Sequence, residues 1–185
     1  MTAIRVATAD DAAAIAAIYR CFVTDTAITF ETEPVSSSDM AERIRAGGDL
    51  YPWFVAEDGA GVQGYAYASQ FRPRHAYRFA VETTVYLHPN AVRRGLGSAL
   101  YERGLATARA QGFTQAIAAI TLPNEPSVAL HEKHGFRQVG TYHQVGYKLG
   151  AWYDVGLWQC ELGPSPAAPG EPRGLSELER PLYRR

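Results

Sequence analysis

The stretch with the clearest chemical potential lies mid-chain and combines two arginines, two glycines and a serine. It follows a β-branched run at residues 81–87 and begins a helical pattern that continues to about Gln111. The first N–H groups of a helix have no partner inside the helix, and its dipole adds partial positive charge there. Glycines let the backbone approach an anion closely. The pattern therefore predicts a phosphate-binding turn formed by Arg93, Arg94, Gly95, Leu96, Gly97 and Ser98.

Two common phosphate-binding motifs do not fit this turn. The chain has no Gly-x-x-x-x-Gly-Lys-Ser/Thr segment, which excludes the P-loop. The dinucleotide fingerprint needs three glycines near the start of a domain, whereas only Gly95 and Gly97 are present here. The turn alone does not distinguish a phosphate-binding site from an ordinary connection between a strand and a helix.

Composition limits the class of protein. A chain of 185 residues, with 46% hydrophobic and 20% charged residues, is typical of one globular domain. The net charge of −1 does not favour nucleic-acid or membrane partners, and no apolar run reaches the roughly 20 residues of a membrane span. No basic-then-apolar leader is present, and Cys21 and Cys160 lack metal-ligand spacing. We therefore expect a cytoplasmic protein with reduced thiols and no metal.

Apolar periodicity and turn residues predict alternating strands and helices. A first strand at 4–7 precedes a Thr8–Asp11 capping box and a helix, and Ser37 or Ser38 is expected to cap a second helix that ends at Gly47-Gly48. Further strands are expected at 51–56, 62–71, 81–87, 113–121, 137–145 and 154–162, with helices up to Gln111 and at 126–134. Residues 1–162 thus form one α/β domain. Residues 163–185 form a proline-rich tail, expected to be extended or disordered, with one helical turn within 175–182 that packs against a partner surface.

This order of elements resembles the GCN5-related N-acetyltransferases (GNAT), whose cofactor motif is Gln/Arg-x-x-Gly-x-Gly/Ala. The matching hexad runs from Val92 to Gly97, with valine in the first position. A second segment, residues 124–136, resembles the family's Leu-Tyr-Glu-Lys-x-Gly-Phe region, with His131 in place of the tyrosine. The resemblance implies the GNAT fold: a mixed, mostly antiparallel sheet with helices on both faces and a splay between the fourth and fifth strands. It also implies acetyl-CoA as the co-substrate.

Within that family, the chain is similar to the phosphinothricin and the methionine sulfone or sulfoximine N-acetyltransferases. The similarity rests on four stretches, residues 29–34, 81–86, 122–132 and 146–159. It implies direct acetyl transfer to a small amino-acid-like amine, and a homodimer. Two other functions stay open: acetylation of protein N-termini or lysines, and CoA binding without turnover.

Glu82 is the candidate catalytic base. It lies in a β-branched strand, where alternation places it beside Thr84 and Tyr86, and apolar neighbours raise the pKa of a carboxylate toward a useful range. The alternative is a glutamate on a solvated strand face. The resemblance also implies a β-bulge in this strand, and main-chain cofactor contacts at Val85, Tyr86 and Leu87.

His131 is the candidate acid for the leaving thiolate or a helper in deprotonation, because imidazole serves either direction near neutral pH. A helix histidine that only orders the cofactor is the competing interpretation. The resemblance assigns Asn124 and Ser127 to the cofactor, although Asn124 can also simply cap the helix that follows it.

Acceptor recognition is assigned to two loops. The first is the basic turn before Glu82, with Arg72, Arg74, His75, Tyr77 and Arg78, and the second is the loop around Phe30. Arginines in the first loop suit a carboxylate, sulfonyl or phosphinate group, because guanidinium donates paired hydrogen bonds. The alternatives are a solvated basic turn and, for Phe30, a core aromatic. The expected acceptor residues are Phe30, Arg74, His75, Ala76, Tyr77 and Arg78.

Overall fold

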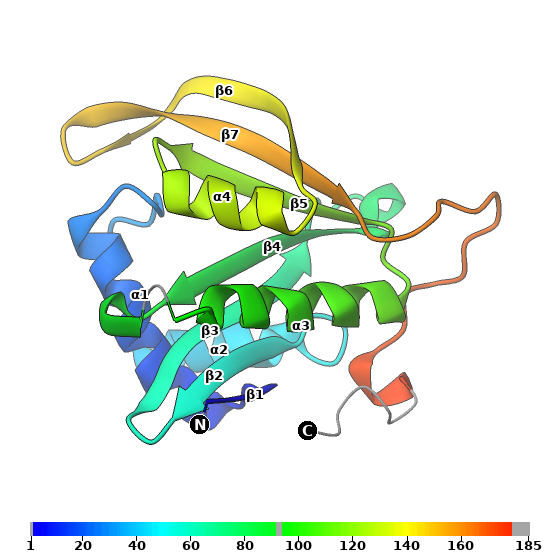
Figure 1. The fold of residues 1–185 in the computed structure, drawn as a ribbon, viewed down its shortest axis with the longest axis horizontal. Helices are drawn as coiled ribbons and strands as arrows, with labels where there is room; N and C mark the ends of the chain where they lie inside the picture. Colours follow the sequence, from blue (N-terminus) through cyan, green and yellow to red (C-terminus); the bar gives the residue numbers. More distant parts are fainter. Residues whose placement is uncertain (1, 92–93, 179–185) are drawn as a thin grey trace.

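One seven-stranded sheet forms the centre of the molecule in the computed structural model, which describes residues 2–91 and 94–178 (Figure 1). Its spatial order is β1-β2-β3-β4-β5-β7-β6, and β4 and β5 are its parallel pair. The strands are β1 (Ala3–Val6), β2 (Trp53–Asp58), β3 (Gly61–Gln70), β4 (Ala80–Leu87), β5 (Gln115–Leu122), β6 (Arg137–Lys148) and β7 (Ala151–Glu161).

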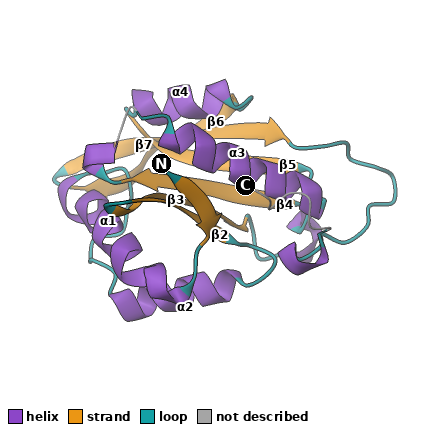
Figure 2. Cartoon of the chain, turned by 60° about the horizontal axis from the view of Figure 1, so that its bottom comes forward, coloured by secondary structure: helices purple, strands orange, loops and turns teal. Residues whose placement is uncertain are grey.

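Helices cover both faces of this sheet, as the sequence predicts (Figure 2). On one face, α1 (Ala12–Asp25) and α2 (Ser37–Gly47) lie side by side, and on the other α3 (Leu96–Gln111) crosses β2, β3 and β4. The fourth helix, α4 (Glu125–Lys133), contacts β5. The cap of α2 is Ser36, whose Oγ accepts from the amide of Asp39 at 3.1 Å, so the predicted cap at Ser37 or Ser38 is wrong.

Two apolar layers hold these helices on the sheet. Beneath α1 and α2, Ile15, Met40 and Ile44 pack against Trp53 and Tyr65. Beneath α3, the buried side chains include Leu100, Tyr101, Leu105, Phe54 and Val81. The β2–β3 surface under α2 carries a close aromatic stack, because the rings of Trp53 and Tyr67 lie 3.9 Å apart at 5°.

The sheet splits between β4 and β5. These strands pair only from Ala80 to Glu82 with Gln115 to Ile117, and beyond that point they diverge. On its other edge β4 stays in unbroken register with β3, from Val81 opposite Gln70 to Leu87 opposite Gly64. The predicted splay is therefore present, whereas the bulge expected in this strand is absent from its pairing with β3. From Thr83 onward, one edge of β4 has no strand partner among the residues that the structure describes.

The β6–β7 hairpin lies beyond the splay, at the edge of the sheet. Its turn passes through Leu149 and Gly150, with φ values of 50° and 80°. The pairing shifts register between Tyr142 and Gly146, where Gln144 also has a positive φ of 50° and its amide donates to Asp154 at 2.8 Å. Both strands are longer than the sequence pattern predicts.

The proline-rich segment leaves β7 without regular structure and then returns to the domain. Its 3-10 turn, Leu175–Glu177, is held by Asp49, whose main-chain carbonyl accepts from the amide of Leu175 at 2.8 Å. Leu178 is buried. Glu171 forms an ion pair with Arg78 at 2.8 Å. The expected turn thus lies against the chain's own domain, and the expectation that it packs on a partner surface is wrong.

Candidate active site

Divergence of β4 and β5 produces a narrow polar cleft of about 80 Å³. One wall comes from β4, the opposite wall from β5 and the end from α4, with Ile28 contributed by the α1–α2 loop (residues 26–36). The lining residues are Ile28, Thr83, Thr84, Val85, Tyr86, Ala119, Ile120, Thr121, Asn124, Ser127 and His131. An unpaired strand edge in such a cleft offers main-chain N–H and C=O groups to an extended ligand.

His131 lines this cleft and has a buried ring nitrogen without a hydrogen-bond partner. Its Nδ1 donates to the Ser127 carbonyl at 2.7 Å, which leaves the lone pair on Nε2. Among the described residues, Nε2 is the buried side-chain polar atom that lacks a hydrogen-bond partner. Burial lowers the pKa of His131 below its usual value of 6.5, and the ring is fixed edge-on against Tyr101 and Phe136. The resting ring is therefore neutral, with Nε2 able to accept a proton.

Glu82 lies where the two strands separate, as the last β4 residue still paired with β5. Glu82 pairs across the sheet with Ser69. The next pair on the same face of the sheet is Thr84 with Tyr67. Burial raises the pKa of Glu82 above its usual 4.5, and the positive charge of Arg72 opposes that rise. Its carboxylate makes no hydrogen bond to any described residue, so it is free to accept a proton from a ligand.

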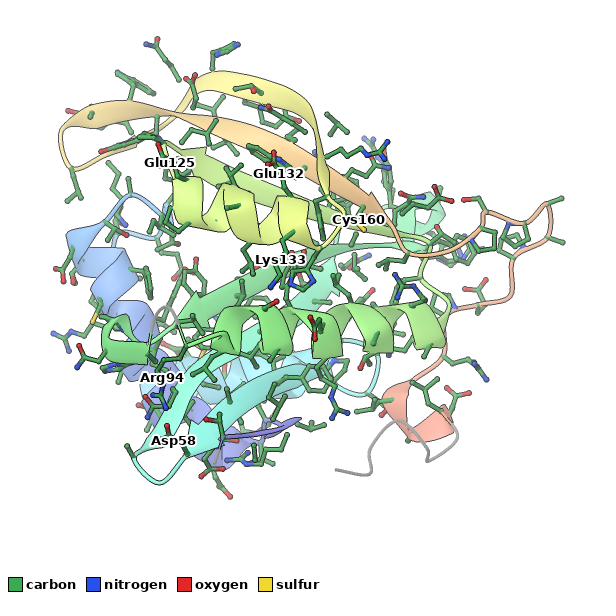
Figure 3. The ribbon with its side chains drawn as sticks, viewed as in Figure 1. Asp58, Arg94, Glu125, Glu132, Lys133 and Cys160 are labelled. Atoms are coloured by element: carbon green, nitrogen blue, oxygen red, sulfur yellow. The ribbon has the colours of Figure 1, made fainter. Side chains whose placement is uncertain are left out.

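The glycine turn leads directly into α3, where the sequence predicts a helix. Gly95 is the N-cap of α3 with φ of 78°, a left-handed conformation that favours glycine, and its carbonyl accepts from the amide of Ala99 at 3.1 Å. Arg94 reaches Asp58 at 3.0 Å (Figure 3), whereas the predicted contribution of Arg93 lies outside the described residues. The amides at the start of α3 are the groups that suit an anion.

The other predicted cofactor residues of this turn begin α3. Leu96 and Gly97 are buried, and a Cβ on Gly97 would lie 3.4 Å from Leu87 Cδ1, so Leu87 packs at the mouth of the turn instead of lining the cleft. The hydroxyl of Ser98 accepts from the Lys133 ammonium at 3.0 Å and lies 2.9 Å from His134 Nε2. These contacts give the turn a cationic neighbourhood that the sequence analysis did not identify.

Asn124 and Ser127 both line the cleft and also hold each other. Asn124 Oδ1 accepts from the Ser127 amide at 3.2 Å, so the asparagine caps α4. Its side-chain amide nitrogen is not part of that cap. Val85 and Tyr86 lie on the β4 wall of the cleft, as the resemblance implies.

The arginine loop (residues 72–78) forms a separate pocket of about 340 Å³. Arg72, Arg74 and Tyr77 line it together with Phe71, and Tyr77 contacts the Phe71 ring edge-on. The positive charge of Arg72 lowers the pKa of Glu82, so this pocket and the end of the cleft interact electrostatically. Arg72, which the sequence already places in this basic turn, is thus a lining residue of the pocket.

Three predicted acceptor residues do not line the arginine pocket. Arg78 pairs with Glu171 and lies over the ring of Phe79 at 4.3 Å, so its guanidinium is already engaged. His75 and Ala76 are exposed in a 3-10 turn and do not line the arginine pocket.

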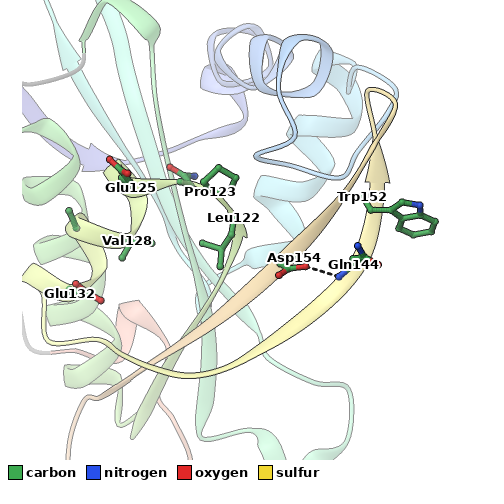
Figure 4. A pocket seen from close by; sticks show the side chains of 10 residues that line it. Leu122, Pro123, Glu125, Val128, Glu132, Gln144, Trp152 and Asp154 are labelled. Atoms are coloured by element: carbon green, nitrogen blue, oxygen red, sulfur yellow. Dashed lines mark hydrogen bonds between the residues drawn. The ribbon is translucent and has the colours of Figure 1, made fainter.

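A larger groove of about 570 Å³ lies between α4 and the β6–β7 hairpin. Figure 4 shows its apolar floor at Leu122, Pro123 and Val128, with Trp152 on the hairpin side. Of the predicted site residues that the structure describes, only Asn124 lines it. The groove therefore lies beside the cleft.

The described residues were also compared with what a metal site and a membrane span require. Residues 2–91 and 94–178 contain no cluster of three or more His, Cys, Asp or Glu side chains that could hold a metal ion. No helix in that part of the chain is long and apolar enough to cross a membrane.

Comparison with known proteins agrees with this geometry. Residues 4–157 match the acetyltransferase (GNAT) domain family. The chain is 43% identical over 170 residues to a phosphinothricin N-acetyltransferase of Streptomyces viridochromogenes, covering 91% of this chain and 93% of that protein. It is 37% identical over 171 residues to an L-methionine sulfoximine/L-methionine sulfone acetyltransferase of Pseudomonas aeruginosa, covering 90% and 98%.

A solved structure extends the similarity to the whole fold. The GNAT phosphinothricin acetyltransferase of Sinorhizobium meliloti, in complex with AcCoA, superposes with a TM-score of 0.86 at 39% identity, covering 100% of this chain and 99% of that one. The β4–β5 cleft, the glycine turn and the family match together lead to one conclusion. The chain belongs to the GNAT family and is an acetyl-CoA-dependent N-acetyltransferase.

Proposed function

We propose that this enzyme acetylates the amine of a small zwitterionic acceptor of the phosphinothricin, methionine sulfone or methionine sulfoximine type. The observation that carries the proposal is the position of Glu82 where β4 and β5 separate: it pairs across the sheet with Ser69 of β3, the strand that leads into the arginine pocket. Arg72 and Arg74 suit the oxygens of such an acceptor, because guanidinium binds them through paired donors. The names of the similar proteins supply the same substrate class.

In the proposed reaction the amine nitrogen bonds to the acetyl carbon and the carbon–sulfur bond breaks. Acetyl-CoA supplies the activated acetyl group. Glu82 takes the proton that the ammonium group must lose before it can attack. Main-chain donors on the free edge of β4, around Val85 and Tyr86, stabilise charge that develops on the carbonyl oxygen. Nε2 of His131 takes the second proton, which the nitrogen loses as the carbon–nitrogen bond forms, and passes it to the sulfur as the carbon–sulfur bond breaks.

No covalent enzyme intermediate is needed. Cys160 is buried, and burial raises the pKa of its thiol, which disfavours the nucleophilic thiolate. Neither Cys160 nor Cys21 lines the cleft. Both are free thiols, which suits a reducing compartment and supports a proposed cytoplasmic location.

A thiol-release assay tests the proposed acceptor class. With acetyl-CoA present, phosphinothricin, methionine sulfone and methionine sulfoximine should each stimulate CoA release, with kcat/KM at least tenfold above that for peptides with free N-termini or lysines. A preference for peptides would replace the proposal with a protein acetyltransferase. CoA binding without acceptor-dependent release would identify a binding module.

Gly95→Ala should weaken CoA binding because alanine resists the left-handed conformation at this N-cap. The strain is about 1 kcal/mol, and relaxing it moves the first amides of α3. Gly112→Ala is the matched control, since Gly112 ends the same helix with φ of 97°. Both variants should lose similar thermal stability, whereas calorimetry should show a raised Kd for CoA only in Gly95→Ala. Equal Kd values would contradict an anion site at this turn.

We also propose that the chain forms a homodimer through the β6–β7 hairpin. Of the large hydrophobic side chains exposed by more than a third, most lie on this hairpin: Val139, Tyr142, Val145, Tyr147, Leu149 and Trp152. In addition, β6 is an edge strand with an unpaired side. Exposed apolar patches and bare strand edges are typical of protein interfaces.

Trp152→Glu should therefore convert the dimer into a monomer, because a carboxylate replaces a ring that is 60% exposed in the single chain. Light scattering coupled to size exclusion measures the mass. Ala60→Glu, on the exposed β2–β3 turn, is the control and should stay dimeric. A monomeric wild-type protein at micromolar concentration would contradict the proposed interface.

A further inference from the structure

A buried lysine joins the β6–β7 hairpin to the α1–α2 loop. Lys148, the last residue of β6, is only 5% exposed. Its ammonium donates to the Thr29 carbonyl at 2.7 Å and to the Phe22 carbonyl at 3.4 Å. Phe22 lies in the last turn of α1, where main-chain carbonyls carry partial negative charge. The cation is therefore held by a helix end and by a loop carbonyl.

Gly146 makes a second contact between the same two segments. A Cβ built on Gly146 would overlap the Phe30 ring at Cζ, so the aromatic ring occupies the space that any side chain would need. Gly146 and Lys148 are two residues apart on one strand and share a face. Both contacts thus come from one face of β6, and Figure 1 shows the hairpin turn beside the α1–α2 loop.

The loop held in this way forms part of the site. Ile28, next to Thr29, lines the β4–β5 cleft, and Phe30 follows directly with 38% of its surface exposed. Tyr19 fixes the Thr29 hydroxyl at 2.6 Å, and Arg43 fixes Glu31 at 2.7 Å. Lys148 adds a hydrogen-bonded contact from outside the α1–α2 layer, beside the packing of Phe30 against Gly146.

We propose that Lys148 is a positioning residue for acetyl transfer: its ammonium holds Thr29, and with it Ile28 and Phe30, as a preformed wall on the acceptor side of the cleft. Without this contact, only a fraction of molecules has the loop in the binding-competent position, and apparent acceptor affinity falls by that fraction. At saturating acceptor the site fills, and the chemical step is unchanged. The effect on the reaction rests on the proposed function.

Steady-state kinetics of Lys148→Met tests this role. The variant keeps an unbranched side chain and removes the donors, so the acceptor KM should rise at least tenfold, with kcat and the Kd for CoA within threefold of wild type. Lys148→Arg keeps a cationic donor and should recover most of the loss. Arg137→Met, which removes an exposed charge from the other end of β6, is the matched control and should not change KM. An unchanged acceptor KM in folded Lys148→Met would overturn the proposal.

A second measurement does not depend on turnover. The chain has two lysines, the exposed Lys133 and the buried Lys148, so mass spectrometry can follow both with an amine-reactive N-hydroxysuccinimide ester. Lys148 should react at least tenfold more slowly than Lys133, and Gly146→Ala should speed labelling of Lys148 alone by displacing Phe30. Equal labelling rates in the wild type would contradict the tether. Slow labelling without acetyl transfer would instead count against the proposed function.

Discussion

Glu82→Gln is expected to lower kcat for acetyl transfer by a factor of about 10²–10⁴, the usual contribution of a positioned general base. Glutamine has the size of glutamate but cannot take the ammonium proton. Burial raises the pKa of Glu82, so the wild-type carboxylate is a stronger base than an exposed glutamate. Stopped-flow or steady-state thiol release measures the change, and calorimetry should give an unchanged Kd for CoA.

The pH profile separates a base from a structural carboxylate. Because the base form is required, wild-type kcat/KM should fall as pH decreases through the raised pKa of Glu82, above the usual 4.5. The residual activity of Glu82→Gln should lack this acidic limb. Glu42→Gln changes an exposed carboxylate on α2 and should retain wild-type kcat. Wild-type kcat in Glu82→Gln would end the assignment.

His131→Asn is expected to lower kcat by about 10²-fold, at the lower end for a group that moves a proton. The asparagine amide can still donate to the Ser127 carbonyl, as Nδ1 does at 2.7 Å, but it has no basic nitrogen in place of Nε2. The change thus removes the proton acceptor while keeping the side-chain contact within α4. Thermal stability and CoA affinity should stay close to wild type.

This substitution also decides between the two roles open for His131. If the ring only orders the cofactor, His131→Asn should raise the Kd for CoA and leave kcat at saturation nearly unchanged. His143→Asn is the control, since His143 is 78% exposed on the hairpin. Burial lowers the pKa of His131 below 6.5, so the neutral base form persists through neutral pH and is lost only in acid.

Much of the fold follows from local patterns in the sequence. The β-branched run before the glycine turn becomes β4, and the apolar stripe after it becomes α3, because strand and helix periodicities are encoded locally. The middle of the last hairpin is different. Its turn uses Leu149 in a left-handed conformation, which leucine does not signal, and the bulge at Gln144 depends on Asp154 ten residues later.

The candidate site also combines residues that the sequence indicates locally with contacts that only the folded structure shows. Glu82 and His131 lie in recognisable segments, and the structure adds the burial and the unpartnered Nε2 that define their chemistry. Lys148 holds a carbonyl 119 positions earlier in the chain, and Arg78 pairs with a carboxylate 93 positions later. Contacts over such separations arise from the folded sheet and have no local signal. The acceptor wall was therefore predictable only in part.

The central claim is that the cofactor enters the splay between β4 and β5 and is held at the start of α3. Hydrogen-exchange mass spectrometry with saturating acetyl-CoA tests it directly, because a ligand on a free strand edge shields main-chain amides. Slower exchange is expected in peptides that cover residues 83–87 and 95–99, with no change across β1 and β2. Unchanged exchange in both regions of a protein that binds acetyl-CoA would contradict the account.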